Sequence, residues 1–88
     1  MVLVTILRHV WGGTLPSLDA ILRKDFGHRL RTIRLERKLS QERFAEHVGI
    51  SVDFLSLIER GRNAPSFQTL DRISRRLRVR VADLFTFD

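Results

Sequence analysis

From Phe26 onward, hydrophobic residues return every three or four positions, with polar and basic residues between them. The series begins with Phe26, Leu30 and Ile33, takes in Arg34 on the same face, and runs to Leu39. This spacing is that of one face of an amphipathic α-helix, because 3.6 residues make one turn. The pattern therefore predicts a first helix that ends at Leu39.

Serine and glycine residues divide the rest of the chain into short helices. A serine side chain accepts a hydrogen bond from the first turn of a helix, and glycine takes the left-handed conformation that often ends one. The helices bounded in this way are 41–48 between Ser40 and Gly49, 52–60 between Ser51 and Gly61, one that starts after Ser66, and a last short turn over 81–85. The sequence thus predicts five helices within residues 26–88.

The apolar faces of these helices form the predicted core. Its later members are Phe44, Ala45, Val48, Phe67, Leu70, Ile73, Leu77, Leu84 and Phe85. Helices this short bury too little surface to be stable alone, so they must pack on one another. Only Gly49-Ile50-Ser51 separates the helices 41–48 and 52–60, and a three-residue turn with a glycine makes two helices cross steeply. One of them then braces the other, which projects its outer face.

Residues 1–25 differ from the helical region. The run Val2–Val10 is rich in β-branched residues and favours a strand, Trp11–Pro16 is a turn or loop signal, and Ser17 is placed to cap a short helix within the segment. A single strand is not stable alone, so the run pairs with a copy of itself, packs on the domain or stays disordered. It could equally be upstream sequence outside the domain's function. We therefore predict an N-terminal extension over 1–25.

Net charge narrows the range of partners. Sixteen Lys and Arg residues against ten Asp and Glu give a formal charge of +6, and the isoelectric point is near 11.4. Such a field favours a polyanion, nucleic acid first and an acidic protein or membrane surface second, although a soluble basic surface has the same balance. Only Lys24 and Lys38 are lysines, and the planar guanidinium of arginine suits two-pronged contacts with phosphate or guanine.

Several classes of function find no support in the sequence. The absence of cysteine excludes thiolate metal sites and suits a reducing cytoplasm, which is the predicted location. His9, His28 and His47 lack spaced ligand partners, so neither a metal nor another cofactor is expected. No apolar run reaches the roughly 18–20 residues that span a bilayer, and the apolar start lacks a basic leader. With no nucleophile–base set or phosphate loop visible, we expect neither an enzyme nor a small-molecule site.

Two runs of residues resemble a known family. LSQERFAEHVGIS (39–51) resembles the run LSQ-xx-LA-xx-xG-xS of the Cro- and phage-repressor-like (XRE-type) helix-turn-helix family, and FLSLIERGRNAPS (54–66) resembles its run IS-x-IE-x-G-xxx-P-S. The match covers 26–88 and is specific, because many positions agree in order and spacing. The resemblance implies an all-α, five-helix, lambda-repressor-like domain. Such a domain docks helix 52–60 into the major groove of double-stranded DNA, usually as a homodimer on a two-fold site.

The resemblance also implies roles for individual residues. It places Gln41, at the start of the bracing helix, on a phosphate, and it pairs Arg34 with Glu59 as a partly buried salt bridge. The residues implied to face the groove are Ser51, Val52, Asp53, Ser56 and Leu57. Those implied to reach backbone phosphates after the helix are Arg60, Arg62 and Asn63.

The groove-facing residues depart from many relatives, which carry Gln, Ser, Thr, Lys or Arg at positions 52, 53 and 57. Asp53 can accept a hydrogen bond from a cytosine amino group, or it is simply a favourable charge in the first helical turn. Val52 and Leu57 touch thymine methyl groups or are exposed apolar residues. We therefore predict a DNA-binding transcription regulator, a dimeric repressor or controller that reads methyl groups and shape. The alternative is an antitoxin-like protein-interaction module, which the same apolar residues would serve.

Two further features concern the C-terminal part of the chain. Its densest basic run, typical of a solvated helix face, is Arg72, Arg75, Arg76, Arg78 and Arg80. Relatives often carry Gly or Asn at the position of Arg78, so we expect a strained turn there. Phe85 and Phe87 exceed what a small core needs, which favours one of them in a dimer contact.

Overall fold

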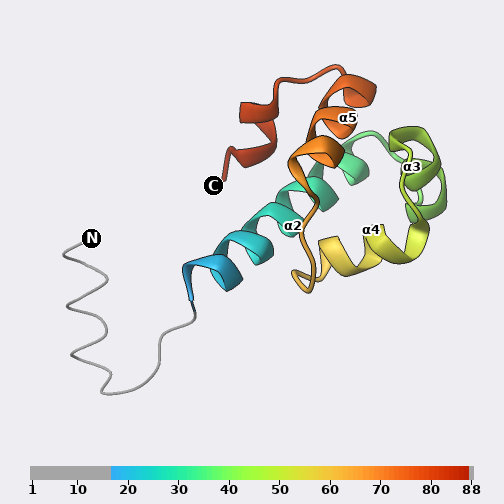
Figure 1. The fold of residues 1–88 in the computed structure, drawn as a ribbon. Helices are drawn as coiled ribbons and strands as arrows, with labels where there is room; N and C mark the ends of the chain where they lie inside the picture. The colour runs from blue at the N-terminus through green and yellow to red at the C-terminus, as the bar shows by residue number, and fades with distance from the viewer. Residues whose placement is uncertain (1–16, 88) are drawn as a thin grey trace, which may run out of the picture.

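Every regular element in residues 17–87, the part of the chain that the computed structural model describes, is helical. The elements are α2 (Leu18–Glu36), α3 (Gln41–Val48), α4 (Val52–Glu59), α5 (Phe67–Leu77) and the short 3₁₀ helix η1 (Val81–Phe85). The long helix α2 packs against α4 and η1, while α3 packs against α4 and α5 (Figure 1). The predicted all-α class and the order of five helical elements are confirmed.

The first helix begins earlier than the hydrophobic pattern indicates. α2 starts at Leu18 and continues to Glu36 without a break, so the separate short helix expected within residues 1–25 is wrong. No proline interrupts the chain here, and packing holds the one glycine inside the helix. The predicted boundary between extension and domain therefore falls within α2. The strand expected over 2–10 lies outside the described residues.

Serine caps and left-handed residues bound these helices as the sequence predicts. The side chains of Ser17, Ser40, Ser51 and Ser66 each accept a hydrogen bond from a backbone N–H three residues later, at 3.0–3.2 Å. Gly49 and Gly61 both have positive φ, at 80° and 72°. Arg78 also lies in the left-handed region, with φ 58°, so the strain expected at this position is present.

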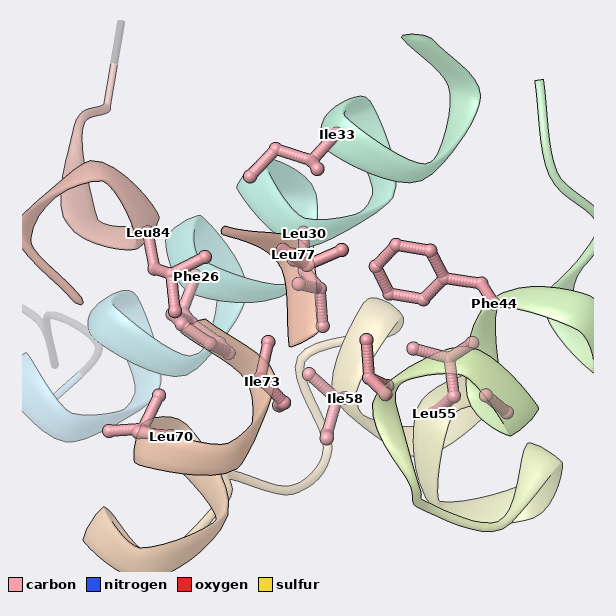
Figure 2. Packing of buried hydrophobic residues seen from close by; sticks show 12 residues of the cluster. Phe26, Leu30, Ile33, Phe44, Leu55, Ile58, Leu70, Ile73, Leu77 and Leu84 are labelled. Atoms are coloured by element: carbon pink, nitrogen blue, oxygen red, sulfur yellow. The ribbon is translucent and has the colours of Figure 1, made fainter. Parts of the chain in front are cut away.

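One hydrophobic core joins all five elements (Figure 2). Its largest fully buried side chains are Phe44, Leu30, Leu55, Ile58, Ile73, Leu77, Leu84 and Val48. Two predicted members differ. Phe67 is 89% exposed, because it is the first residue of α5 and projects beyond the core, while the buried stripe of that helix includes Ser74 instead. Phe85 is 42% exposed, so in η1 only Leu84 is fully buried.

The backbones of α2 and α4 approach closely because one glycine within α2 and another just after α4 lie at their contact. A Cβ added at Gly27, in the middle of α2, would overlap the carbonyl oxygen of Ile58. A Cβ at Gly61, just after α4, would lie 3.0 Å from the Cα of Lys24. This contact fixes the position of α4 on α2 and so determines which face of α4 points outward.

Candidate nucleic-acid interface

The turn between α3 and α4 consists of three residues. Gly49 ends α3, and its backbone N–H donates to the carbonyl of Ala45 at 2.9 Å. The Ile50 N–H donates to the same carbonyl at 3.0 Å, and the Ile50 side chain packs against the core. Ser51 then caps α4 by accepting from the N–H of Phe54 at 3.0 Å. The chain therefore changes direction through a turn held by these three hydrogen bonds, with α3 packed against α4.

The two sides of α4 differ in chemistry. Leu55 and Ile58 are fully buried, and they set the inner side of the helix. Residues one, four, five and eight positions after Val52 lie on the other side, because 3.6 residues make one turn. This outer side carries Val52, Asp53, Ser56, Leu57 and Arg60. The structure therefore brings four of the five predicted groove-facing residues onto one face, where Val52 and Asp53 are exposed and Ser56 and Leu57 are half-buried. The fifth, Ser51, precedes α4 and caps it.

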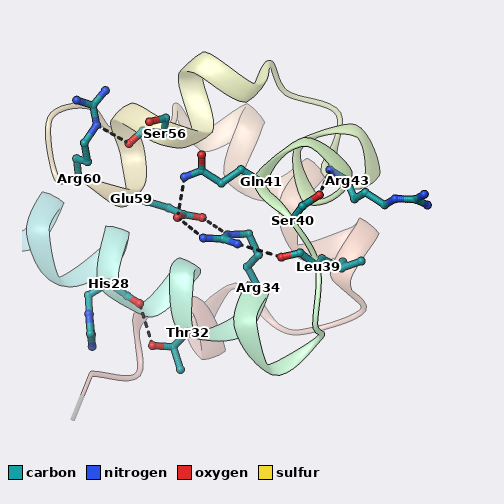
Figure 3. Close-up of polar contacts among 10 residues, drawn as sticks. All are labelled: His28, Thr32, Arg34, Leu39, Ser40, Gln41, Arg43, Ser56, Glu59 and Arg60. Atoms are coloured by element: carbon teal, nitrogen blue, oxygen red, sulfur yellow. Dashed lines mark hydrogen bonds and ion pairs between the residues drawn. The ribbon is translucent and has the colours of Figure 1, made fainter.

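A buried ion pair ties this helix to α2 (Figure 3). Arg34 donates from Nε to Glu59 Oε2 at 2.7 Å and from Nη2 to Glu59 Oε1 at 2.9 Å. Its Nη1 donates to the Leu39 carbonyl at 2.9 Å. The two side chains are only 10% and 3% exposed. The hydrogen bonds to Glu59 raise the pKa of Arg34 above its ordinary value despite the opposing effect of burial. The salt bridge that the resemblance implies is thus present.

Gln41 joins the same network. Its Nε2 donates to Glu59 Oε1 at 3.1 Å, across from the Arg34 bond to that oxygen (Figure 3). One amide N–H is used in this way, so a second N–H and the carbonyl oxygen remain for a ligand. Glu59 therefore orients Gln41 at the start of α3, and its contact with a phosphate stays a prediction.

The residues that follow α4 are polar and exposed. Arg60 donates from Nε to the Ser56 carbonyl at 3.3 Å, which lays its side chain back along the helix. The Arg62 backbone N–H donates to the Leu57 carbonyl at 2.9 Å. Asn63 accepts the Ala64 N–H at 2.8 Å through its side-chain oxygen, which leaves its amide N–H groups as donors. Three residues with hydrogen-bond donors in their side chains thus follow the candidate groove-facing helix in the chain, and the first of them lies back along it.

Two arginines of α5 support the turn, and the sequence does not reveal this role. Arg72 donates from Nη1 to the Gly49 carbonyl at 3.0 Å, and Arg76 donates to the His47 carbonyl at 3.4 Å. These carbonyls lie at the C-terminal end of α3, where the helix dipole favours a positive charge. The basic run of α5 is therefore not only a solvated face. Its partners lie 23 and 29 residues away in the chain, so no local pattern could have identified them.

Two kinds of site are absent from the described residues. None of their helices is long and apolar enough to cross a membrane. Within 17–87, no three side chains of His, Cys, Asp or Glu are grouped so that they could hold a metal ion.

Known proteins resemble this chain over the same region. The helix-turn-helix family HTH_3 matches residues 30–84. The immunity repressor protein of Bacillus phage phi105 is 41% identical over 56 residues, which are 64% of this chain and 39% of the repressor. Control protein C.MunI of Mycoplasma sp is 36% identical over 62 residues, 69% of this chain and 84% of that protein.

A solved structure extends the similarity to three dimensions. The restriction-modification controller protein C.AhdI from Aeromonas hydrophila superimposes with a TM-score of 0.67 at 30% identity. The superposition covers 72% of this chain and 96% of the controller. The matched region is therefore nearly the whole of a small controller but only about two fifths of the phage repressor.

Proposed function

This chain belongs to the helix-turn-helix family HTH_3, and from that premise we propose that it is a transcription regulator that binds double-stranded DNA sequence-specifically. The helix α4 enters the major groove, and α3 braces it from behind. The repressor and the controllers among its relatives support a repressor or controller role rather than an enzymatic one.

One observation carries this proposal: α4 is held rigidly on its inner side and carries the groove-facing set on its outer side. With its side chains, an α-helix is about 10–12 Å across. The major groove is about 12 Å wide and admits an α-helix. The buried pair of Arg34 and Glu59 holds this helix at a fixed angle, which is what reading a groove requires.

Different residues serve affinity and sequence reading. Arg60, Arg62 and Asn63 lie beyond α4 and contact backbone phosphates, which give affinity without sequence information. Val52 and Leu57 meet thymine methyl groups, and Asp53 accepts a hydrogen bond from an exposed base amino group. Gln41, oriented by Glu59, contacts a phosphate near the amino-terminal end of α3. The protein therefore reads methyl groups and groove shape more than guanine edges.

We further propose that the protein acts as a homodimer in the cytoplasm. A two-fold dimer places two copies of α4 in successive major grooves, so the half-sites lie about 34–36 Å apart, one helical turn of DNA. Neither a metal nor another cofactor takes part in this binding.

Selection of binding sites from a random duplex pool tests the proposal directly. We expect an enriched motif with two-fold symmetry, and an affinity that falls steeply as the salt concentration rises. Arg62→Ala should weaken binding to every sequence alike and lower the salt slope by about 1. Leu57→Ala should instead change the preferred bases. Arg75→Ala is the matched control, because Arg75 is exposed on α5 and paired with Asp71.

Two results would overturn the proposal. One is a selection that enriches no motif over random DNA. The other is an affinity for DNA that Arg60→Ala and Arg62→Ala leave unchanged, together with co-purification of a stoichiometric partner protein. The latter pair of results would favour the antitoxin-like interaction module.

A further inference from the structure

An apolar groove lies at the end of α2 that is farther from α3. The first turns of α2 (blue in Figure 1), the loop before α5 and the 3₁₀ helix η1 surround it. Phe26 and Leu70, which are 4% and 6% exposed, form its floor. Leu22, Phe67 and Phe85 line its sides, and its volume is about 170 Å³.

Several apolar side chains at the walls of this groove are exposed to solvent. Phe67 is 89% exposed, Leu22 is 43% exposed and Phe85 is 42% exposed. On the same stretch of α2, Leu18 and Ile21 are 65% and 41% exposed. Scattered apolar residues on a surface need no explanation, but a contiguous patch around a hollow indicates an interaction site.

The chain itself supplies a suitable occupant next to the groove. Sixteen residues precede Ser17, and nine of them are hydrophobic. The last of them, Pro16, is three positions before Asp19, which lines the groove. An attached segment is present at a high effective concentration, so it binds ahead of a separate molecule of equal affinity.

The spacing of residues in this segment matches the distance that it must cover. The groove runs beside α2 from Asp19 to Phe26, which is about 10 Å of helix at 1.5 Å per residue. The five residues 12–16 between Trp11 and Ser17 reach at most about 18 Å when extended. They include Gly12, Gly13 and Pro16, residue types that favour a reversal of the chain.

We propose that residues 3–11 fold back onto this groove, with the indole of Trp11 seated between Phe67, Leu22 and Phe85. A tryptophan suits the site because the groove has the volume of a large side chain and two exposed phenylalanine rings at its walls. Aromatic rings pair favourably edge to face, as Phe85 and Phe87 already do at 6.0 Å between ring centroids. Phe26 and Phe85 also pair, in a tilted arrangement at 5.1 Å. The segment thus covers the apolar end of the domain and leaves α4 free. This proposal is independent of DNA binding.

Intrinsic fluorescence of the full chain tests it without a label. Trp11 is the only tryptophan, and there is no tyrosine, so the emission reports on residue 11 alone. We expect Trp11 to emit at a shorter wavelength than free tryptophan amide does, and to be quenched only weakly by acrylamide. Phe67→Asp should raise the quenching constant severalfold, toward that of the free amide. Leu35→Asp is the matched control, because Leu35 is 51% exposed at the opposite end of α2.

A second variant and a dilution series complete the experiment. Leu22→Asp should have the effect of Phe67→Asp, and circular dichroism should show unchanged helicity in both variants because both side chains are exposed. Protection of Trp11 should not change when the protein is diluted below the concentration at which sedimentation shows only monomers. The proposal would be overturned if acrylamide quenched Trp11 of the unmodified chain as strongly as it quenches free tryptophan amide. It would also be overturned if Trp11 stayed protected from acrylamide in both variants. Protection lost on dilution would also overturn it and assign the groove to a second copy.

Discussion

The junction of α2 with α4 and the junction of α5 with η1 differ in their backbone conformation and in how deeply their ion pairs are buried. At the first, Gly27 lets two backbones touch, and the ion pair of Arg34 with Glu59 is almost wholly buried. At the second, Arg78 takes a left-handed conformation that a side chain disfavours, and the ion pair of Arg80 with Asp83 has side chains 83% and 35% exposed. The junction of α2 with α4, which has the buried ion pair, is the one that sets the angle of α4.

The two ion pairs show how burial determines the contribution of an arginine–carboxylate pair to stability. The Arg80 side chain donates hydrogen bonds that lower the pKa of Asp83, so the stabilisation is present at neutral pH and lost as the pH falls through that lowered pKa. Water screens this pair, and exposed pairs contribute little. The pair of Arg34 with Glu59 is shielded from water, so each partner depends on the other. Stability and geometry are thus concentrated at the junction that presents α4, the helix that we propose binds DNA.

The largest effect should come from removing one member of the buried pair. Glu59→Ala leaves the Arg34 guanidinium buried without a counter-charge and removes the acceptor of Gln41. Stranding a buried charge costs about 3–5 kcal/mol, a large part of the roughly 3–10 kcal/mol that stabilises a domain of this size. Urea unfolding followed by circular dichroism measures the loss.

Asp83→Ala is the matched control at the junction of α5 with η1. It breaks an ion pair of the same type at the surface, so the unfolding midpoint should move far less. Equal shifts for Glu59→Ala and Asp83→Ala would show that burial does not distinguish the junctions. A double variant, Arg34→Met with Glu59→Met, should recover part of the loss because it leaves no unpaired charge.

A smaller loss should follow from one added methyl group in α2. Gly27→Ala gains about 1 kcal/mol of helix propensity, but its Cβ overlaps the Ile58 carbonyl and forces α4 away from α2. Overpacking against a backbone that cannot yield should outweigh this gain and leave a net loss of about 2 kcal/mol. His28→Ala, at the next and exposed position, is the control. The same urea titration checks this prediction, and stabilisation by Gly27→Ala would contradict it.

The sequence predicts local features of this molecule well and long-range features poorly. The caps at Ser40 and Ser51 and the left-handed turn at Gly49 follow from chemistry within a few residues, and the structure has all three. The contact of Gly27 with Ile58 and the exposure of Phe67 depend on how distant helices meet. A helix period assigns Phe67 to the buried stripe, but it does not reveal where the neighbouring helices stop.

The same distinction applies to the candidate interface. Family resemblance placed Arg34 with Glu59 and gathered the outer residues of α4, because those positions keep their order in the chain. It did not show that Glu59 also holds Gln41, or that Arg72 reaches the carbonyl of Gly49. Both contacts join residues brought together only by the crossing of helices. The orientation of the interface is therefore a tertiary property, although most of its members can be recognised from the sequence.

The smallest effect on stability, and the only increase, is expected at the junction of α5 with η1. Arg78 has φ 58° and ψ 44°, where a Cβ crowds the following carbonyl, at a cost of about 1–2 kcal/mol. Arg78→Gly removes this strain but also loses a favourable charge at the C-terminal end of α5 and makes the unfolded chain more flexible. The net gain should be about 0.5–1 kcal/mol, a small rise in the urea midpoint. Arg78→Ala removes the charge and keeps the Cβ, so it should not stabilise. If alanine stabilises as much as glycine, the arginine side chain is the source of the cost, and the backbone conformation that distinguishes this junction is not strained.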